Sequence, residues 1–91
     1  MIIKHSSIKL EEFNECPGKQ SVLDFFSSNG ILFDVVNLEK SYWQNVEDTL
    51  VISMSKKDID GILKFLIYFN SQDETHFISR KDKVYFRLWW D

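Results

Sequence analysis

The stretch Val84-Tyr85-Phe86-Arg87-Leu88-Trp89-Trp90-Asp91 decides the fold of this chain. Most of its residues are β-branched or aromatic, and such residues favour a pleated, half-buried strand. Successive side chains of a strand point to opposite faces, so large rings fall on both faces of this one. The chain has 91 residues, which is enough for one domain with one core. We therefore expect one face of this strand to carry exposed aromatic surface.

A hairpin that turns at Lys81-Asp82 is predicted to join this strand to the one before it. If Phe77 faces Phe86, side-chain alternation divides the hairpin into two faces. The apolar face, which we expect in the core, also holds Thr75, Ser79, Val84, Leu88 and Trp90. The other face mixes rings with cations and holds His76, Ile78, Arg80, Lys83, Tyr85, Arg87 and Trp89.

Three helices are predicted upstream of the hairpin. Two are short, over residues 8–15 and 20–28, and the Pro17-Gly18 pair turns the chain between them. Gly30 suits the left-handed position that ends the second helix. The third and longest covers residues 56–69, and its last two turns are apolar nearly all round. Such a helix is either deeply buried or meets a partner.

Two further strands are predicted over residues 31–36 and 49–54, and the polar segment 37–48 between them is either a loop or a broken helical turn. This order of elements indicates a single α+β domain over residues 1–91. We expect an antiparallel or mixed sheet of about four strands, with the helices on one face and a C-terminal β-hairpin.

The composition indicates an acidic, folded protein without internal disulfide bonds. The net charge is −3, and the single cysteine, Cys16, excludes an internal disulfide and any multi-cysteine zinc site. A chain with one thiol fits a reducing compartment, so we expect a cytoplasmic protein. The most apolar stretch, residues 62–69, is far too short to cross a bilayer, and we expect no membrane partner.

The usual catalytic residues are nearly missing. His5, His76 and Cys16 lack the short paired spacing of metal ligands, so we expect no metal. Cys16 would close the first predicted helix, where the negative end of the dipole raises a thiol pKa and disfavours a nucleophile. No glycine-rich phosphate loop is present. We expect a binding protein that is not an enzyme and needs no cofactor.

Two segments have the composition of binding surfaces. In the terminal hairpin, rings and cations on one face are typical of single-strand nucleic-acid binding, although a solvated outer face would look the same. Its residues are Arg80, Lys83, Tyr85, Arg87 and Trp89, with Lys81 in the turn. Because the chain is acidic overall, we expect no nucleic-acid partner at physiological salt.

The second segment combines aromatic residues with carboxylates. Rings serve as anchors in protein interfaces and acids steer a cationic partner, so this segment predicts a protein-binding site. Its residues are Asp34, Glu39, Tyr42, Trp43, Glu47 and Asp48. The alternative is an ordinary loop in which Trp43 folds back as a lid on the core. We expect Trp43 to be at least partly exposed.

The chain resembles the small immunity proteins that bacteria make against their own toxins, as in colicin and contact-dependent growth inhibition systems. The resemblance is carried by the length, the acidic charge, the Tyr42-Trp43-(x)3-Glu47-Asp48 stretch and the ending Trp89-Trp90-Asp91. It implies a tight complex with a toxin, often a basic nuclease, whose active site the protein occludes. Inhibitors that phages make against bacterial defence enzymes share this profile, and a small single-strand nucleic-acid-binding module is the alternative from another class.

Overall fold

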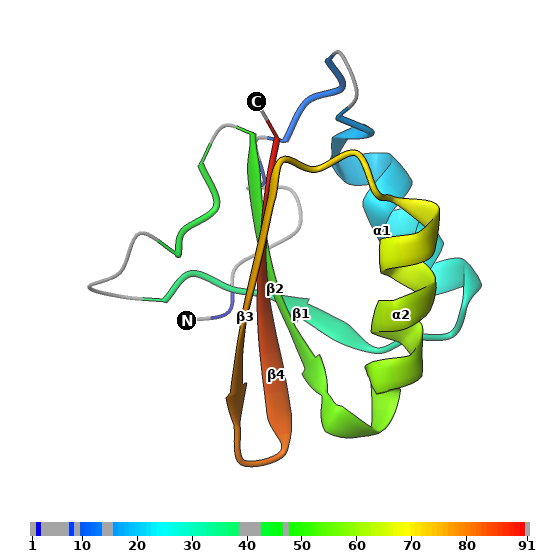
Figure 1. Ribbon diagram of the computed structural model, residues 1–91, viewed down its shortest axis with the longest axis vertical. Helices are drawn as coiled ribbons and strands as arrows, with labels where there is room; N and C mark the ends of the chain where they lie inside the picture. Colours follow the sequence, from blue (N-terminus) through cyan, green and yellow to red (C-terminus); the bar gives the residue numbers. More distant parts are fainter. Residues whose placement is uncertain are drawn as a thin grey trace.

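The structure is a computed structural model that describes residues 2, 8, 10–13, 16–38, 43–46 and 48–90. Four strands form one antiparallel sheet in the order β1-β2-β4-β3, and two helices cover one of its faces (Figure 1). In chain order the elements are α1 (Gly18–Ser28), β1 (Phe33–Val35), β2 (Thr49–Ser55), the 3-10 turn η2 (Lys56–Asp58), α2 (Ile59–Tyr68), β3 (Glu74–Arg80) and β4 (Lys83–Trp89). The α+β class with a small sheet is confirmed, and the sheet is antiparallel rather than mixed.

The C-terminal hairpin has the predicted register. Phe77 lies opposite Phe86, and the chain turns at Lys81-Asp82. On its other side β4 pairs with β2, where Ile52 lies opposite Phe86. A strand with neighbours on both sides and helices over one face buries its apolar side chains. Val84, Phe86, Leu88 and Trp90 are accordingly all in the main core.

The predicted helix over residues 8–15 is wrong for the part of it that the structure describes. Residues 8 and 10–13 are not helical, and Phe13 and Cys16 form an antiparallel bridge instead. Ile8 and Leu10 are both buried, and a spacing of two residues is that of an extended segment. The apolar spacing in this stretch is too loose for one helical face, and the core takes up Ile8 and Leu10 without a helix.

The other two helices agree with the sequence. α1 ends at Ser28 and is followed, as predicted, by Gly30 in the left-handed conformation, with a φ of 66°. The N–H of Ile31 donates to the carbonyl of Phe26 (3.0 Å) and that of Gly30 donates to Ser27 (3.2 Å), which is a Schellman ending. The third predicted helix begins as the 3-10 turn η2 and continues as α2.

α2 lies close to the segment that enters β1, and a glycine makes this possible. A Cβ atom on Gly61 would lie 2.5 Å from Cδ1 of Ile31, closer than real side-chain contacts allow. One turn later the ring of Phe65 stacks on that of Phe26, with centroids 5.0 Å apart and planes 6° apart. These contacts join both helices to one core on the inner face of the sheet, the face that α1 and α2 cover.

The opposite face of the sheet, which we call the outer face, has a smaller core of its own. Trp43 is only 5% exposed and packs with Val36 and Val51. The expectation that Trp43 is exposed is therefore wrong, and the alternative of a lid is what the fold adopts. The lid differs from the expected one in its place, because it covers the outer face and not the main core.

The side chain of Asn45 holds this lid, the loop that carries Trp43, against the sheet. Asn45 donates from Nδ2 to the carbonyl of Val36 (2.6 Å), and its Oδ1 accepts the N–H of Val51 (2.9 Å). The backbone N–H of Leu38 donates to the carbonyl of Trp43 (2.8 Å) and closes the loop. The side chain of Asn45 thus helps to hold the loop that carries the indole ring against the sheet.

Phe77 contradicts the expectation that its whole hairpin face belongs to the core. It is on the inner face but is 68% exposed, and Thr75 beside it is exposed as well. The reason is strand order: β3 is an edge of the described sheet, and the helices do not reach far enough to cover it (Figure 1). The terminal strand itself does not carry the exposed aromatic surface that we expected, because its outer-face rings Tyr85 and Trp89 are half-buried; the exposed ring of the hairpin is Phe77 on β3.

Candidate protein-binding face

The outer face brings together residues from both segments that the sequence singled out. Asp34 comes from the acidic segment and lies on β1, whereas Lys83 comes from the basic hairpin and lies on β4. The Nζ atom of Lys83 is 3.4 Å from Oδ2 of Asp34, across the intervening strand β2. Asp34 and Lys83, one residue from each predicted site, therefore lie on one surface.

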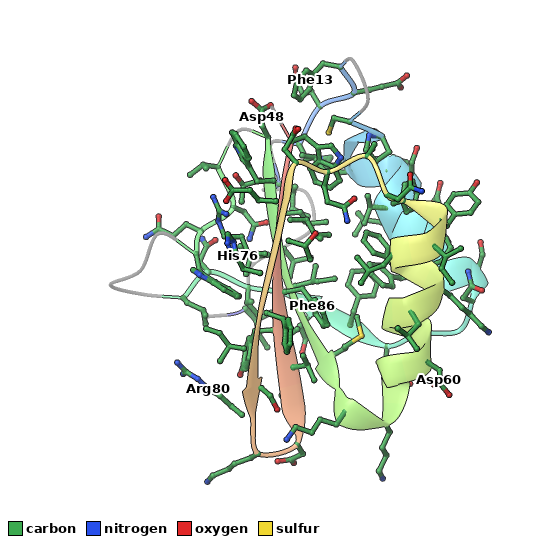
Figure 2. All side chains as sticks on the ribbon, viewed as in Figure 1. Phe13, Asp48, Asp60, His76, Arg80 and Phe86 are labelled. Atoms are coloured by element: carbon green, nitrogen blue, oxygen red, sulfur yellow. The ribbon has the colours of Figure 1, made fainter. Side chains whose placement is uncertain are left out.

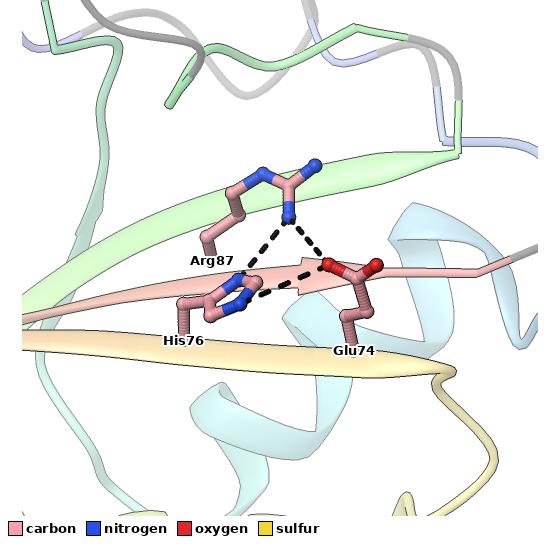
Figure 3. A network of polar contacts seen from close by, with 3 residues as sticks. All are labelled: Glu74, His76 and Arg87. Atoms are coloured by element: carbon pink, nitrogen blue, oxygen red, sulfur yellow. Dashed lines mark hydrogen bonds and ion pairs between the residues drawn. The ribbon is translucent and has the colours of Figure 1, made fainter.

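A polar network occupies the β3–β4 part of this face (Figure 3). One guanidinium nitrogen of Arg87 lies 3.3 Å from Nδ1 of His76 and 3.6 Å from Oε1 of Glu74. The other ring nitrogen of His76 is 3.8 Å from the same carboxylate oxygen. His76 also lies beside Trp43, with ring centroids 6.4 Å apart. The network thus joins the lid to the edge of the sheet.

At one end of the sheet, three acidic residues lie along the backbone next to the half-buried Trp89. β3 begins at Glu74, directly opposite Trp89, and the N–H of Asp73 donates to the Trp89 carbonyl (2.9 Å). On the other side of β4, the carbonyl of Asp48 accepts the N–H of Trp90 (2.9 Å). We call Asp48, Asp73, Glu74 and Trp89 together the acidic end of the sheet.

The opposite end of the sheet is rich in cations. Arg80 and Lys83 flank the hairpin turn, and Lys56 follows β2 and donates its N–H to the carbonyl of Asp82 (2.9 Å). Asp48 and Arg80 indeed lie at opposite ends of the sheet (Figure 2). Charge is therefore separated along the strands, and the basic character of the terminal hairpin is concentrated at its turn.

The predicted acidic site is only partly described. Glu39, Tyr42 and Glu47 lie outside the described residues, and Trp43 is buried. Of that set, Asp34 and Asp48 remain, at different places on the sheet. Asp73 and Glu74 were not among the site residues predicted from the sequence. The hairpin register could have located Glu74, because continuing that register past Thr75 puts Glu74 opposite Trp89.

The predicted nucleic-acid face is present in outline, since Tyr85 and Trp89 share one face of β4 with Arg87 between them. Two of its cations have a carboxylate nearby, Lys83 at 3.4 Å and Arg87 at 3.6 Å. Tyr85 packs against the outer core instead of offering an open ring. Paired cations neutralise fewer phosphates, and this weakens the electrostatic term on which nucleic-acid binding depends.

Cys16 is not poised for nucleophilic chemistry, although its setting differs from the expected one. It lies just before the start of α1, where a helix dipole would favour the thiolate. Burial is the largest influence and raises the pKa of the Cys16 thiol. A backbone hydrogen bond from Gly18 lowers the pKa and the charge of Asp48 raises it further. A buried thiol with a raised pKa is a poor nucleophile at neutral pH.

Within the described ranges, no three His, Cys, Asp or Glu residues are grouped so that they could hold a metal ion. In the same part of the chain, neither helix has the length and apolar character needed to cross a membrane. Comparison with models of protein families, with curated proteins and with solved structures finds no match to this chain.

Proposed function

We propose that this protein is an inhibitor of the immunity type, which neutralises a basic toxin, such as a nuclease, by covering its active site. One observation carries the proposal. The acidic end presents the half-buried ring of Trp89 with Glu74 on the strand beside it and Asp48 next to the strand on its other side. An indole amid carboxylates is the pairing of anchor and steering charge that suits a cationic protein surface.

The backbone around Trp89 supports its use as an anchor. β4 is paired with β2 on one side and with β3 on the other, so the position of the ring is held from both sides. A ring on a rigid strand loses little conformational entropy when a partner covers it. Trp89 therefore fits the description of a binding hot spot, whereas a ring on a free loop would have to be ordered first.

The charge distribution supports a cationic partner approaching from one direction. The chain carries a net charge of −3, and the sheet has acids at one end and Arg80, Lys83 and Lys56 at the other. A separated charge distribution orients a partner before contact and raises the association rate at low salt. A defence enzyme with a basic active site would be recognised by the same chemistry.

Co-expression tests the proposal. Each protein encoded next to the gene for this chain is produced in a bacterial host with and without it. We expect one of them to stop growth alone and to be neutralised by this chain. Trp89→Ala should weaken that complex by about 2 kcal/mol. If no neighbouring product is toxic, or this chain neutralises none, the proposal fails.

A charge-reversal pair provides the matched control for steering. Asp48→Lys changes the acidic end, and Asp82→Lys makes the same change in net charge at the basic end. We expect Asp48→Lys to slow association several-fold at low salt and Asp82→Lys to have a much smaller effect. Equal effects of the two variants would show that the association rate depends on the net charge and not on where the acidic residues lie.

A further inference from the structure

We infer that the chain forms a two-fold symmetric dimer in which the β3 strands of two copies pair antiparallel and continue the sheet. The inference rests on observations other than those behind the inhibitor proposal, and the two share Glu74. It begins from an apolar groove between α2 and β3, of about 490 Å³, lined mainly by Leu66, Phe77, Val84 and Phe86. The groove opens at an edge of the described sheet, where Phe77 is 68% exposed.

Exposed apolar side chains continue from the groove onto α2. Leu63 and Ile67 are 58% and 77% exposed and lie one turn apart. Leu66, three residues after Leu63, lines the groove, so the three side chains belong to one strip. Apolar surface of this kind beside an open strand is typical of a surface that a partner covers.

The hydrogen-bond pattern of the sheet shows which backbone groups of β3 face the open edge. Lys56 donates to the carbonyl of Asp82 and Trp90 donates to that of Asp48, each at 2.9 Å. These contacts direct the even-numbered residues along β4 toward β2. Because hydrogen-bonded pairs alternate along an antiparallel strand, the odd-numbered residues of β4 are directed toward β3.

On β3 the alternation assigns the open positions. Tyr85 of β4 faces Ile78, so Ile78 uses its N–H and C=O toward β4. The next residue, Phe77, directs its N–H and C=O to the open edge, as do Thr75 and Ser79. A second strand can therefore hydrogen-bond at these three positions and bring side chains beside Phe77.

The sequence of β3 is complementary to itself about Phe77, and this selects a second copy as the occupant. If two β3 strands pair antiparallel with Phe77 on the two-fold axis, Glu74 lies opposite Arg80 of the partner copy. Thr75 then lies opposite Ser79 of the partner copy, and Phe77 opposite Phe77 of the partner copy. Opposite charges, hydroxyl pairs and aromatic pairs are the cross-strand pairs that stabilise a sheet.

This register also pairs the backbone hydrogen-bonding groups that β3 directs to the open edge. It sets open positions against open positions, and it pairs all seven residues of β3. The two-fold axis runs perpendicular to the sheet, so the α2 helices of both copies lie on the same face. Their exposed strips then approach each other above the two Phe77 rings. The acidic end of each copy lies beside the basic end of the other.

Disulfide trapping tests the register. In Thr75→Cys/Ser79→Cys the two sites lie opposite each other across the interface, at the Cα–Cα separation of about 5.5 Å that a disulfide accepts. Within one chain they are four residues apart, roughly 13 Å along a strand, which is too far for a bond. We expect mild oxidation to give covalent dimers of the double variant but not of either single variant.

Sedimentation equilibrium tests whether the unmodified chain dimerises. We expect a reversible dimer at micromolar concentrations, and we expect Phe77→Thr to weaken it at least tenfold. Leu32→Thr is the matched control, because Leu32 is 82% exposed next to β1 at the other edge of the sheet and should leave the dimer unchanged. A chain that stays monomeric, or single variants that cross-link as readily as the double variant, would overturn the inference.

Discussion

On each face of the sheet, one aromatic residue has the opposite exposure to the one that the sequence predicts. Phe77 lies on the inner face with the main core and is 68% exposed, whereas Trp43 covers the outer face and is 5% exposed. Alternation along each strand assigns side chains to faces correctly. It does not say which part of a face is covered. Coverage depends on where helices and loops lie across the strand order: the outer face of β3 meets the Trp43 cluster through Ile78, whereas Phe77 on its inner face is left exposed.

The two cores also differ in what holds them together. The inner core joins both helices to three strands through large apolar contacts, such as the stack of Phe26 on Phe65. The outer core is a small cluster around Trp43, and the loop that carries this ring is held by the hydrogen bonds of Asn45. We therefore expect inner-face variants to affect the whole fold and outer-face variants to release mainly the lid.

The largest effect is expected from Phe26→Ala. Phe26 is fully buried between α2 and the sheet, so its removal leaves a cavity that the two helices cannot easily fill. Such truncations cost about 3–5 kcal/mol of unfolding free energy. Urea denaturation followed by far-UV circular dichroism measures the loss. A loss below about 1 kcal/mol would show that the helices repack, and that the inner core is looser than the contacts indicate.

Trp43→Ala is expected to cost somewhat less, about 3 kcal/mol, because the indole is buried in a cluster of few residues. Hydrogen exchange distinguishes this change from Phe26→Ala. The amides of Leu38 and Val51, which the lid protects, should exchange faster, while those of α1 keep their relative protection. Unchanged stability would mean that Trp43 leaves the sheet readily, and would restore it as a candidate partner contact.

The sequence predicts best where a single element decides the outcome. The register of the hairpin followed from its turn and its alternation, and the end of α1 followed from Gly30. The placements of Trp43 and Phe77 failed because each depends on a distant segment crossing a face. The site divides in the same way. Trp89 and Asp48 were each singled out, but only the pairing of β2 with β4 brings them to one end of the sheet.

Asn45→Ala tests whether hydrogen bonds hold the lid. The variant leaves the N–H of Val51 without its side-chain acceptor, and Val51 is fully buried. We expect a loss of about 1–3 kcal/mol of unfolding free energy, because a buried donor without an acceptor keeps its desolvation cost. Asn29→Ala is the control, since it removes an exposed side-chain hydrogen bond to the carbonyl of Phe25. Thermal denaturation should rank the two in that order, and equal losses would contradict the pinning role.

The smallest effect on the folded monomer is expected from Phe77→Thr, and it completes the comparison with Trp43. Phe77 touches the protein mainly through its ring stack on Phe86, at a centroid separation of 6.1 Å, and threonine suits an edge strand well. At concentrations below dimerisation, unfolding free energy should fall by less than about 1 kcal/mol. At high protein concentration the difference in unfolding free energy between the variant and the unmodified chain should widen, because a dimer stabilises the folded state by mass action. A difference that is large at every concentration would show that Phe77 belongs to the core. A difference that is small at every concentration would show that Phe77 takes no part in self-association.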